Sequence, residues 1–196
     1  MSLVVAVKQN DRVIMMADSV TSSGESLTEI TDPHLFKIQK IGQVLVGSVG
    51  TVQNIRTLTT HKEWFDTKKE ELDKKFICKN IIPRLIDALS KDHLLENGEV
   101  RRNKATVLIA KGSRLFIINH SFQVFEIEDF SAIGYTESFA RPIIASAGKE
   151  EQLSAVLKAL RVSASLAGSV REPFYQIDTK TLEYQRIPDG GGTNQT

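Results

Sequence analysis

The stretch Leu3-Val-Val-Ala-Val7, followed after a polar turn by Val13-Ile-Met-Met16, decides the fold of this chain. Gln9, Asn10 and Asp11 separate the two apolar runs, and polar residues of this kind are typical of a tight turn. The two runs therefore predict a β-hairpin. Because both runs are almost continuously apolar, rather than alternating, we expect other parts of the protein to cover both faces of these strands.

The rest of the chain alternates between strand-like and helix-like segments. Further strands are predicted over 34–41, 44–49, 105–110, 114–119, 124–126, 131–134, 174–178 and 183–187. Helices are predicted over 51–75, 83–95, 138–146 and 150–166, and a long polar loop over 22–33. This order predicts an α+β fold, a four-layer αββα sandwich in which two antiparallel sheets lie between helical layers. We expect one domain over residues 1–189 and a flexible Gly-rich tail over 190–196.

Composition excludes several classes of function. Of the 196 residues, 41% are hydrophobic and 25% are charged, which is typical of a soluble globular protein. A formal net charge of +1 argues against a nucleic-acid surface, which needs a basic excess. No run of about 18 apolar residues predicts a membrane helix. Cys78 is the single cysteine, so an internal disulfide is excluded and a cytoplasmic location is expected.

A more specific signal comes from the order of several short segments. They are Ser2-Leu-Val-Val-Ala-Val-Lys8, Val13-Ile-Met-Met-Ala-Asp18-Ser19, Phe36-Lys37-Ile38, Gln43-Val-Leu-Val-Gly-Ser-Val-Gly50, Ala105-Thr-Val-Leu-Ile-Ala110 and Ser131-Ala-Ile-Gly134. In this order the chain resembles the proteasome β-type subunits and the related bacterial ring protease. These are N-terminal nucleophile hydrolases, in which the first residue of the mature chain is catalytic.

The resemblance implies roles for four residues near the beginning of the chain. Ser2 would be the nucleophile once Met1 is removed, and its own α-amine would act as the base. An α-amine suits this role because its ordinary pKa of about 7.7–8 is close to the working pH. Lys37 would hold positive charge beside the nucleophile and Asp18 would orient Lys37. Gly50 would offer its backbone N–H to the developing oxyanion.

The resemblance also implies candidates where this chain departs from the family pattern. Ser22 lies near the position of a substrate-contacting threonine. The family has a Gly-Ser-Gly turn whose serine supports the catalytic amine. This chain has Gly134-Tyr135-Thr136-Glu137, which leaves the hydroxyl of Tyr135, or that of Thr136 one position later, as the candidate. The family also has an aspartate and a serine late in a helix, where this chain offers Ser165 and Ser169.

Two functions from different classes follow. The first is a peptidase or amidohydrolase, or a related transpeptidase, that acts on peptide bonds of a peptide or protein substrate. It would work in a homo-oligomeric ring with an ATPase partner, and without a metal or cofactor. The second is a catalytically silent subunit that serves in assembly or binding. Ser2, Asp18 and Lys37 favour the first function, whereas Tyr135 and Ser165 favour the second.

Overall fold

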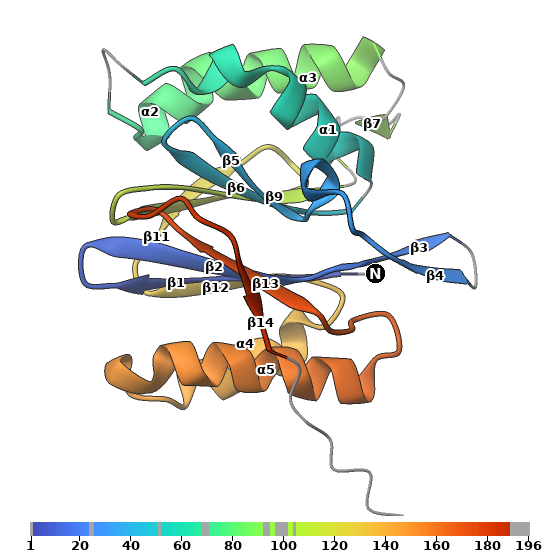
Figure 1. Ribbon diagram of the computed structural model, residues 1–196. Helices are drawn as coiled ribbons and strands as arrows, with labels where there is room; N and C mark the ends of the chain where they lie inside the picture. The colour runs from blue at the N-terminus through green and yellow to red at the C-terminus, as the bar shows by residue number, and fades with distance from the viewer. Residues whose placement is uncertain are drawn as a thin grey trace, which may run out of the picture.

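The computed structural model describes residues 2–23, 26–50, 52–67, 71–91, 95–96, 102–103 and 105–188. Two five-stranded antiparallel sheets lie face to face, and a helical layer covers the outer face of each sheet (Figure 1). The predicted αββα sandwich is therefore confirmed. The tail 190–196 lies outside the described residues, and the single domain over 1–189 stays a prediction.

The first sheet carries the hairpin that opens the chain. Its strand order is β12-β1-β2-β13-β14. The hairpin pairs Val4 with Ala17, and its tight turn contains Asn10 at φ 53, a backbone angle that asparagine tolerates better than most residues. The strands span β1 (Leu3–Gln9), β2 (Arg12–Asp18), β12 (Phe130–Gly134), β13 (Phe174–Asp178) and β14 (Gln185–Ile187).

The second sheet packs directly on the first. Its strand order is β11-β10-β9-β6-β5, and the strands span β5 (Ile38–Ile41), β6 (Val44–Val49), β9 (Thr106–Lys111), β10 (Arg114–Ile118) and β11 (Val124–Ile127). Apolar side chains such as Met15 and Leu108 fill the space between the sheets. Gly47 permits a close approach of the two sheets, because a Cβ atom there would lie 2.9 Å from Cγ1 of Val4.

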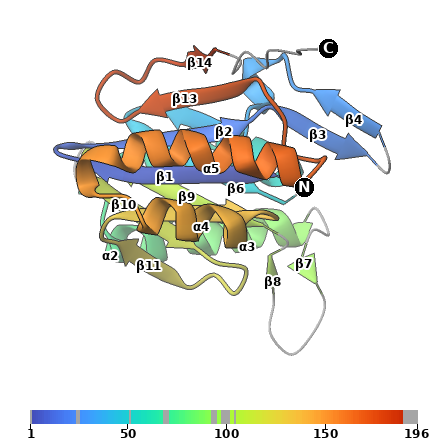
Figure 2. The ribbon, with the colours of Figure 1, turned by 90° about the horizontal axis from the view of Figure 1, so that it is seen from below.

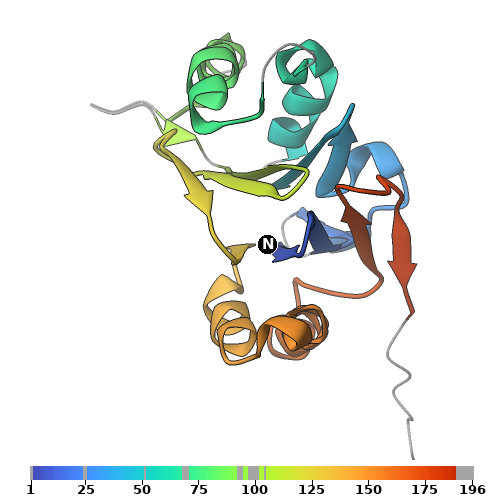
Figure 3. The ribbon, with the colours of Figure 1, turned by 90° about the vertical axis from the view of Figure 1, so that its left-hand side faces the viewer.

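The helices form two separate layers that are best seen end-on (Figure 3). One layer covers the second sheet, with α1 (Val52–Thr60), the 3-10 turn η2 (Lys62–Phe65), α2 (Lys74–Phe76), the π-helical turn η3 (Ile77–Ile81) and α3 (Ile82–Lys91). The other layer covers the first sheet, with α4 (Glu137–Ala145), the 3-10 turn η4 (Lys149–Glu151) and α5 (Gln152–Leu166). The last turn of α5 lies at the same end of the molecule as the N-terminus (Figures 1 and 2).

Among the described residues, no helix is both long enough and apolar enough to cross a membrane.

Several local predictions were wrong, including the strand expected over 34–41, which begins only at Ile38. The expected loop over 22–33 contains a projecting hairpin of β3 (Val20–Ser23) and β4 (Ser26–Glu29) and a 3-10 turn, η1 (Pro33–Leu35). The residues of β4 are all exposed, so the hairpin leaves no apolar pattern in the sequence. The predicted helix 51–75 ends at residue 60, after a run of threonines whose hydroxyls bond to preceding carbonyls. The predicted helix 83–95 begins earlier, and residues 95–96 form β7 (Leu95–Glu96), which pairs with β8 (Arg102–Asn103).

Candidate active site

Ser2 directly precedes β1, and backbone hydrogen bonds hold the chain there on both sides. The N–H of Tyr135 donates to the carbonyl oxygen of Ser2 at 2.9 Å, and the N–H of Leu3 donates to Oδ1 of Asp18 at 2.9 Å. Leu3 is fully buried and Ser2 is partly buried. The main chain of residue 2 is therefore fixed, while part of the residue stays accessible to solvent.

Gly134 makes this position of Ser2 sterically feasible. Its φ is +122°, a left-handed conformation that residues with a side chain rarely adopt. A Cβ atom at this position would lie 2.0 Å from the carbonyl oxygen of Ser2 and 3.2 Å from Cα of Leu3. Only glycine therefore lets β12 run this close to the first residues of β1.

A buried ion pair joins the two sheets beside Ser2. Nζ of Lys37 lies 2.5 Å from Oδ2 of Asp18, and less than a tenth of either side chain is exposed. Asp18 ends β2 in the first sheet, whereas Lys37 immediately precedes β5 in the second sheet. The same carboxylate thus binds the lysine with one oxygen and the amide of Leu3 with the other.

The pair is electrostatically perturbed. Burial raises the pKa of Asp18, while the charge of Lys37 and hydrogen bonds from Lys37 and Leu3 oppose that change. Burial also lowers the pKa of Lys37, and the attraction of Asp18 opposes the change. A lysine desolvated in this way holds its proton less firmly than an exposed lysine does. The site therefore combines a cation with a group that could exchange a proton.

Gly50 lies on the second sheet's side of the site. The N–H of Ser48 donates to the carbonyl oxygen of Lys37 at 2.8 Å, and Gly50 follows two residues later. Gly50 has φ 117, which lets the chain turn from β6 toward α1. The structure therefore brings Gly50 to the end of the sheets at which Ser2, Asp18 and Lys37 also lie.

The other predicted site residues have different surroundings. Thr136 is fully buried directly after the Gly134-Tyr135 step, and Ser169 is buried after α5. Within the described part of the chain, neither hydroxyl has a hydrogen-bond partner. Ser165 instead is exposed, and its Oγ donates to the carbonyl oxygen of Val162 at 2.8 Å. The backbone of Ser22 pairs with that of Leu27 in the β3–β4 hairpin. The side chain of Ser22 is not among those that the structure describes.

Sequence reasoning missed the roles of Gly134 and the amide of Tyr135. Gly134 ends a predicted strand, but its contact with Ser2 depends on the pairing of β12 with β1, which the sequence pattern does not specify.

In the part of the chain that the structure describes, no group of three or more His, Cys, Asp or Glu side chains could hold a metal ion.

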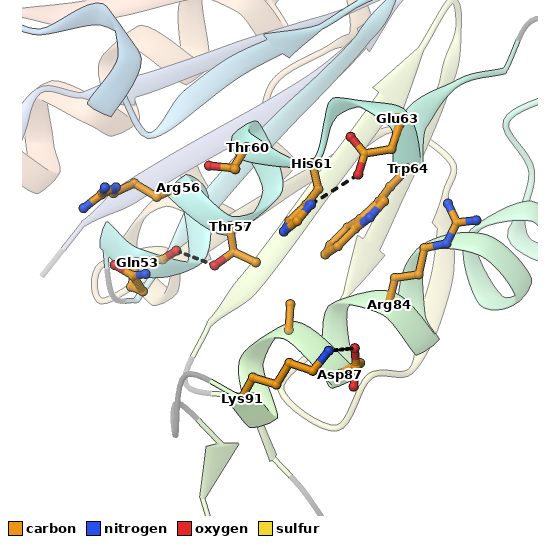
Figure 4. A pocket seen from close by; sticks show the side chains of 11 residues that line it. Gln53, Arg56, Thr57, Thr60, His61, Glu63, Trp64, Arg84, Asp87 and Lys91 are labelled. Atoms are coloured by element: carbon orange, nitrogen blue, oxygen red, sulfur yellow. Dashed lines mark hydrogen bonds and ion pairs between the residues drawn. The ribbon is translucent and has the colours of Figure 1, made fainter.

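A groove of about 640 Å³ lies elsewhere, between α1, η2 and α3 in the outer helical layer (Figure 4). Its wall includes His61 stacked on Trp64, with ring centroids 4.3 Å apart, and the cationic side chains of Arg56 and Arg84. None of the predicted site residues lines this groove. We therefore assign the candidate chemistry to the end of the sheets around Ser2.

A comparison with protein families matches residues 2–166 to the proteasome subunit family. The chain belongs to this family. A curated relative, the ATP-dependent protease subunit HslV of Caldicellulosiruptor saccharolyticus, is 29% identical over 170 residues, which are 83% of this chain and 89% of that protein. This family membership confirms the resemblance that the opening strands carry.

Solved structures of similar proteins share the fold. BPH from Thiobacillus denitrificans is similar with a TM-score of 0.73 and 20% identity over 90% of this chain and 96% of that chain. The same protein in complex with epoxomicin has a TM-score of 0.70 and 19% identity over 90% of this chain and 97% of that chain. This proteasome-subunit chain therefore has the N-terminal nucleophile hydrolase fold.

Proposed function

We propose that this protein is an N-terminal nucleophile peptidase or amidohydrolase that cleaves peptide bonds with Ser2 after Met1 has been removed. The observation that carries the proposal is the double role of Asp18. Its carboxylate binds the buried ammonium of Lys37 and the backbone amide next to Ser2. This arrangement holds a cation and the first residue of the strand in a fixed relation, as nucleophilic catalysis requires.

In the proposed reaction, Oγ of Ser2 attacks the carbonyl carbon of the scissile bond. Its proton passes to the α-amine of Ser2, directly or through a water molecule. The ammonium of Lys37 favours the negatively charged oxygen of the nucleophile, and the N–H of Gly50 stabilises the oxyanion. The C–N bond breaks as the leaving amine takes up the proton. Water then hydrolyses the ester on Ser2 and regenerates the free hydroxyl.

A specific observation favours a second candidate, a catalytically silent subunit for assembly or binding. Tyr135 is 65% exposed where the family has a serine that supports the amine, and the hydroxyl of Ser165 bonds to its own helix. Thr136 and Ser169, whose buried hydroxyls lack partners among the described residues, offer replacements at the same end of the fold. We infer that these two hydroxyls replace the missing supports of the α-amine, which favours the active peptidase over the silent subunit.

We also propose that copies of the chain assemble into a ring that acts on peptide or protein substrates with an ATPase partner. Membership of the proteasome subunit family supports the ring, and the description of HslV as an ATP-dependent protease subunit supports the ATPase. The native mass of the purified protein tests the ring, and a mass equal to one chain would contradict it. The cytoplasmic location stays a prediction from the single cysteine.

Reaction with a peptide epoxyketone or β-lactone, followed by intact-mass measurement, tests the catalytic proposal. We expect a chain without Met1 that gains one reagent molecule, and no adduct on Ser2→Ala. Ser113→Ala, which removes an exposed hydroxyl in the β9–β10 turn, is the matched control and should react like the unmodified protein. Retention of Met1 without an adduct would favour the silent subunit.

A further inference from the structure

Tyr135 combines two properties that suggest contact with a substrate. Its backbone is fixed against the candidate nucleophile, because its N–H bonds to the carbonyl oxygen of Ser2 at 2.9 Å. Its side chain is nevertheless 65% exposed. The backbone of this large aromatic residue is therefore fixed directly beside Ser2, while much of the residue is in contact with solvent.

Two further exposed apolar side chains lie at the same end of the α4–α5 layer. Phe139 is 44% exposed in the first turn of α4, four residues after Tyr135, and Leu166 is 64% exposed at the end of α5. The two helices pack against each other and are joined by a short connection, so the start of α4 and the end of α5 lie close together (Figure 2). We call Tyr135, Phe139 and Leu166 the apolar rim.

This concentration is unusual within the molecule. Five large apolar side chains are exposed in the described part of the chain, and three of them form the apolar rim. The other two are Leu27, in the projecting β3–β4 hairpin, and Phe125, on β11 at the edge of the second sheet. Single exposed apolar residues are ordinary, whereas a group beside a candidate site indicates binding.

We propose that the apolar rim is a substrate subsite, in which Tyr135 receives an apolar side chain next to the scissile bond of a bound peptide. The proposal rests on the proposed peptidase function and names its substrate preference. A peptide whose carbonyl carbon reaches Oγ of Ser2 would lie beside Tyr135, because the backbones of Ser2 and Tyr135 are hydrogen-bonded neighbours. Its neighbouring side chain then removes part of the Tyr135 ring from water, which favours Leu or Phe over a polar residue.

A second copy of the chain is the alternative occupant of the apolar rim. The hydrogen bond between Tyr135 and Ser2 argues against it, because a subunit interface centred on Tyr135 would also cover the candidate nucleophile. We therefore assign the apolar rim to the peptide. The native mass of the purified protein distinguishes a bound peptide from a second copy of the chain.

The test compares two short acetylated peptides that differ only in carrying Leu or Asn on either side of one central bond. The ratio of kcat/KM for the Leu and Asn peptides is measured, together with the ratio of their Kd values on Ser2→Ala, which binds without cleaving. We expect the protein to prefer the Leu peptide, and Tyr135→Ala to lower that preference by about tenfold. Tyr135→Phe keeps the ring and should keep the preference.

Phe125→Ala is the matched control, because it removes an aromatic ring of similar exposure on β11 and should change neither ratio. Equal ratios for Tyr135→Ala and the unmodified protein would overturn the subsite. A changed native mass in Tyr135→Ala with unchanged ratios would assign the rim to a subunit contact instead. A Kd preference that depends on Tyr135, in a protein that cleaves neither peptide, would uphold the subsite and contradict the peptidase function.

Discussion

Replacing Gly134 by alanine tests whether the close packing of β12 against Ser2 organises the site. The added Cβ would lie 2.0 Å from the carbonyl oxygen of Ser2, far inside van der Waals contact. The three nearest atoms all belong to the backbone of Ser2 and Leu3, which cannot rotate away. Residue 2 or the end of β12 must therefore move. We expect Gly134→Ala to destabilise the protein and to displace Ser2.

The magnitude has two parts. An alanine held at φ +122° costs about 1–3 kcal/mol in backbone strain. Loss of the hydrogen bond from Tyr135 to the Ser2 carbonyl adds about 0.5–1.5 kcal/mol. The expected loss of unfolding free energy is therefore about 1.5–4.5 kcal/mol. Because residue 2 moves, the rate of labelling of Ser2 by an electrophile should fall as well.

Urea unfolding, followed by the fluorescence of the single tryptophan, Trp64, measures this loss. Gly112→Ala is the control, because Gly112 also has positive φ, +56°, but nothing lies within 4 Å of the added Cβ. The control should lose only about 1–2 kcal/mol and should label at the normal rate. If Gly134→Ala were no less stable than Gly112→Ala and labelled equally fast, the proposed role of Gly134 would be refuted.

Three further predictions follow from individual contacts. Asp18→Asn should lower the free energy of unfolding in urea by about 3–5 kcal/mol, because it leaves the buried ammonium of Lys37 unpaired. The control Glu126→Gln removes the exposed partner of Arg114 and should lower it by about 1 kcal/mol or less. Gly47→Val should cost about 1–3 kcal/mol or more by separating the sheets at Val4, and an unchanged stability would contradict the packing. Burial alone would raise the pKa of Asp178, but hydrogen bonds from the N–H groups of Thr181 and Lys180 hold that pKa below its ordinary value of 3.8. Its stabilising contribution is therefore complete above pH 3.8 and is lost as the pH falls through the lowered pKa. Asp178→Asn should therefore lose less stability than the unmodified protein as the pH falls below 3.8. Identical plots of unfolding free energy against pH for the two proteins would contradict this reasoning.

The sheets and the covering helices could be predicted because their residues are apolar on regular spacings. The runs around Val4 and Met15 are buried on both faces, and the sequence pattern already indicated this. The β3–β4 hairpin could not be predicted, because an exposed strand pair needs no apolar residues. The early end of α1 also escaped prediction, because the apolar side chains of Trp64 and Phe65 continue the buried pattern after the helix has stopped.

The candidate site was partly predictable for a different reason. Asp18 and Lys37 were expected to pair from the resemblance to the proteasome family, and the structure brings the two side chains together. The backbone contacts of Ser2 were not predictable, since they depend on the register that places Gly134 opposite Leu3. The resemblance also did not reveal that Ser165 lies on the exposed face of α5, where its hydroxyl bonds to the carbonyl oxygen of Val162.

The central claim is that the hydroxyl and the α-amine of Ser2 act together as nucleophile and base. An epoxyketone peptide tests it most directly, because this reagent can bond to a hydroxyl and an amine of the same residue. The measurement is tandem mass spectrometry of the N-terminal peptide of the treated protein. We predict a peptide that begins at Ser2 and carries the reagent on that residue, with no such adduct in Lys37→Ala. An N-terminal peptide that still begins with Met1, or a reagent bound at another residue, would contradict the account.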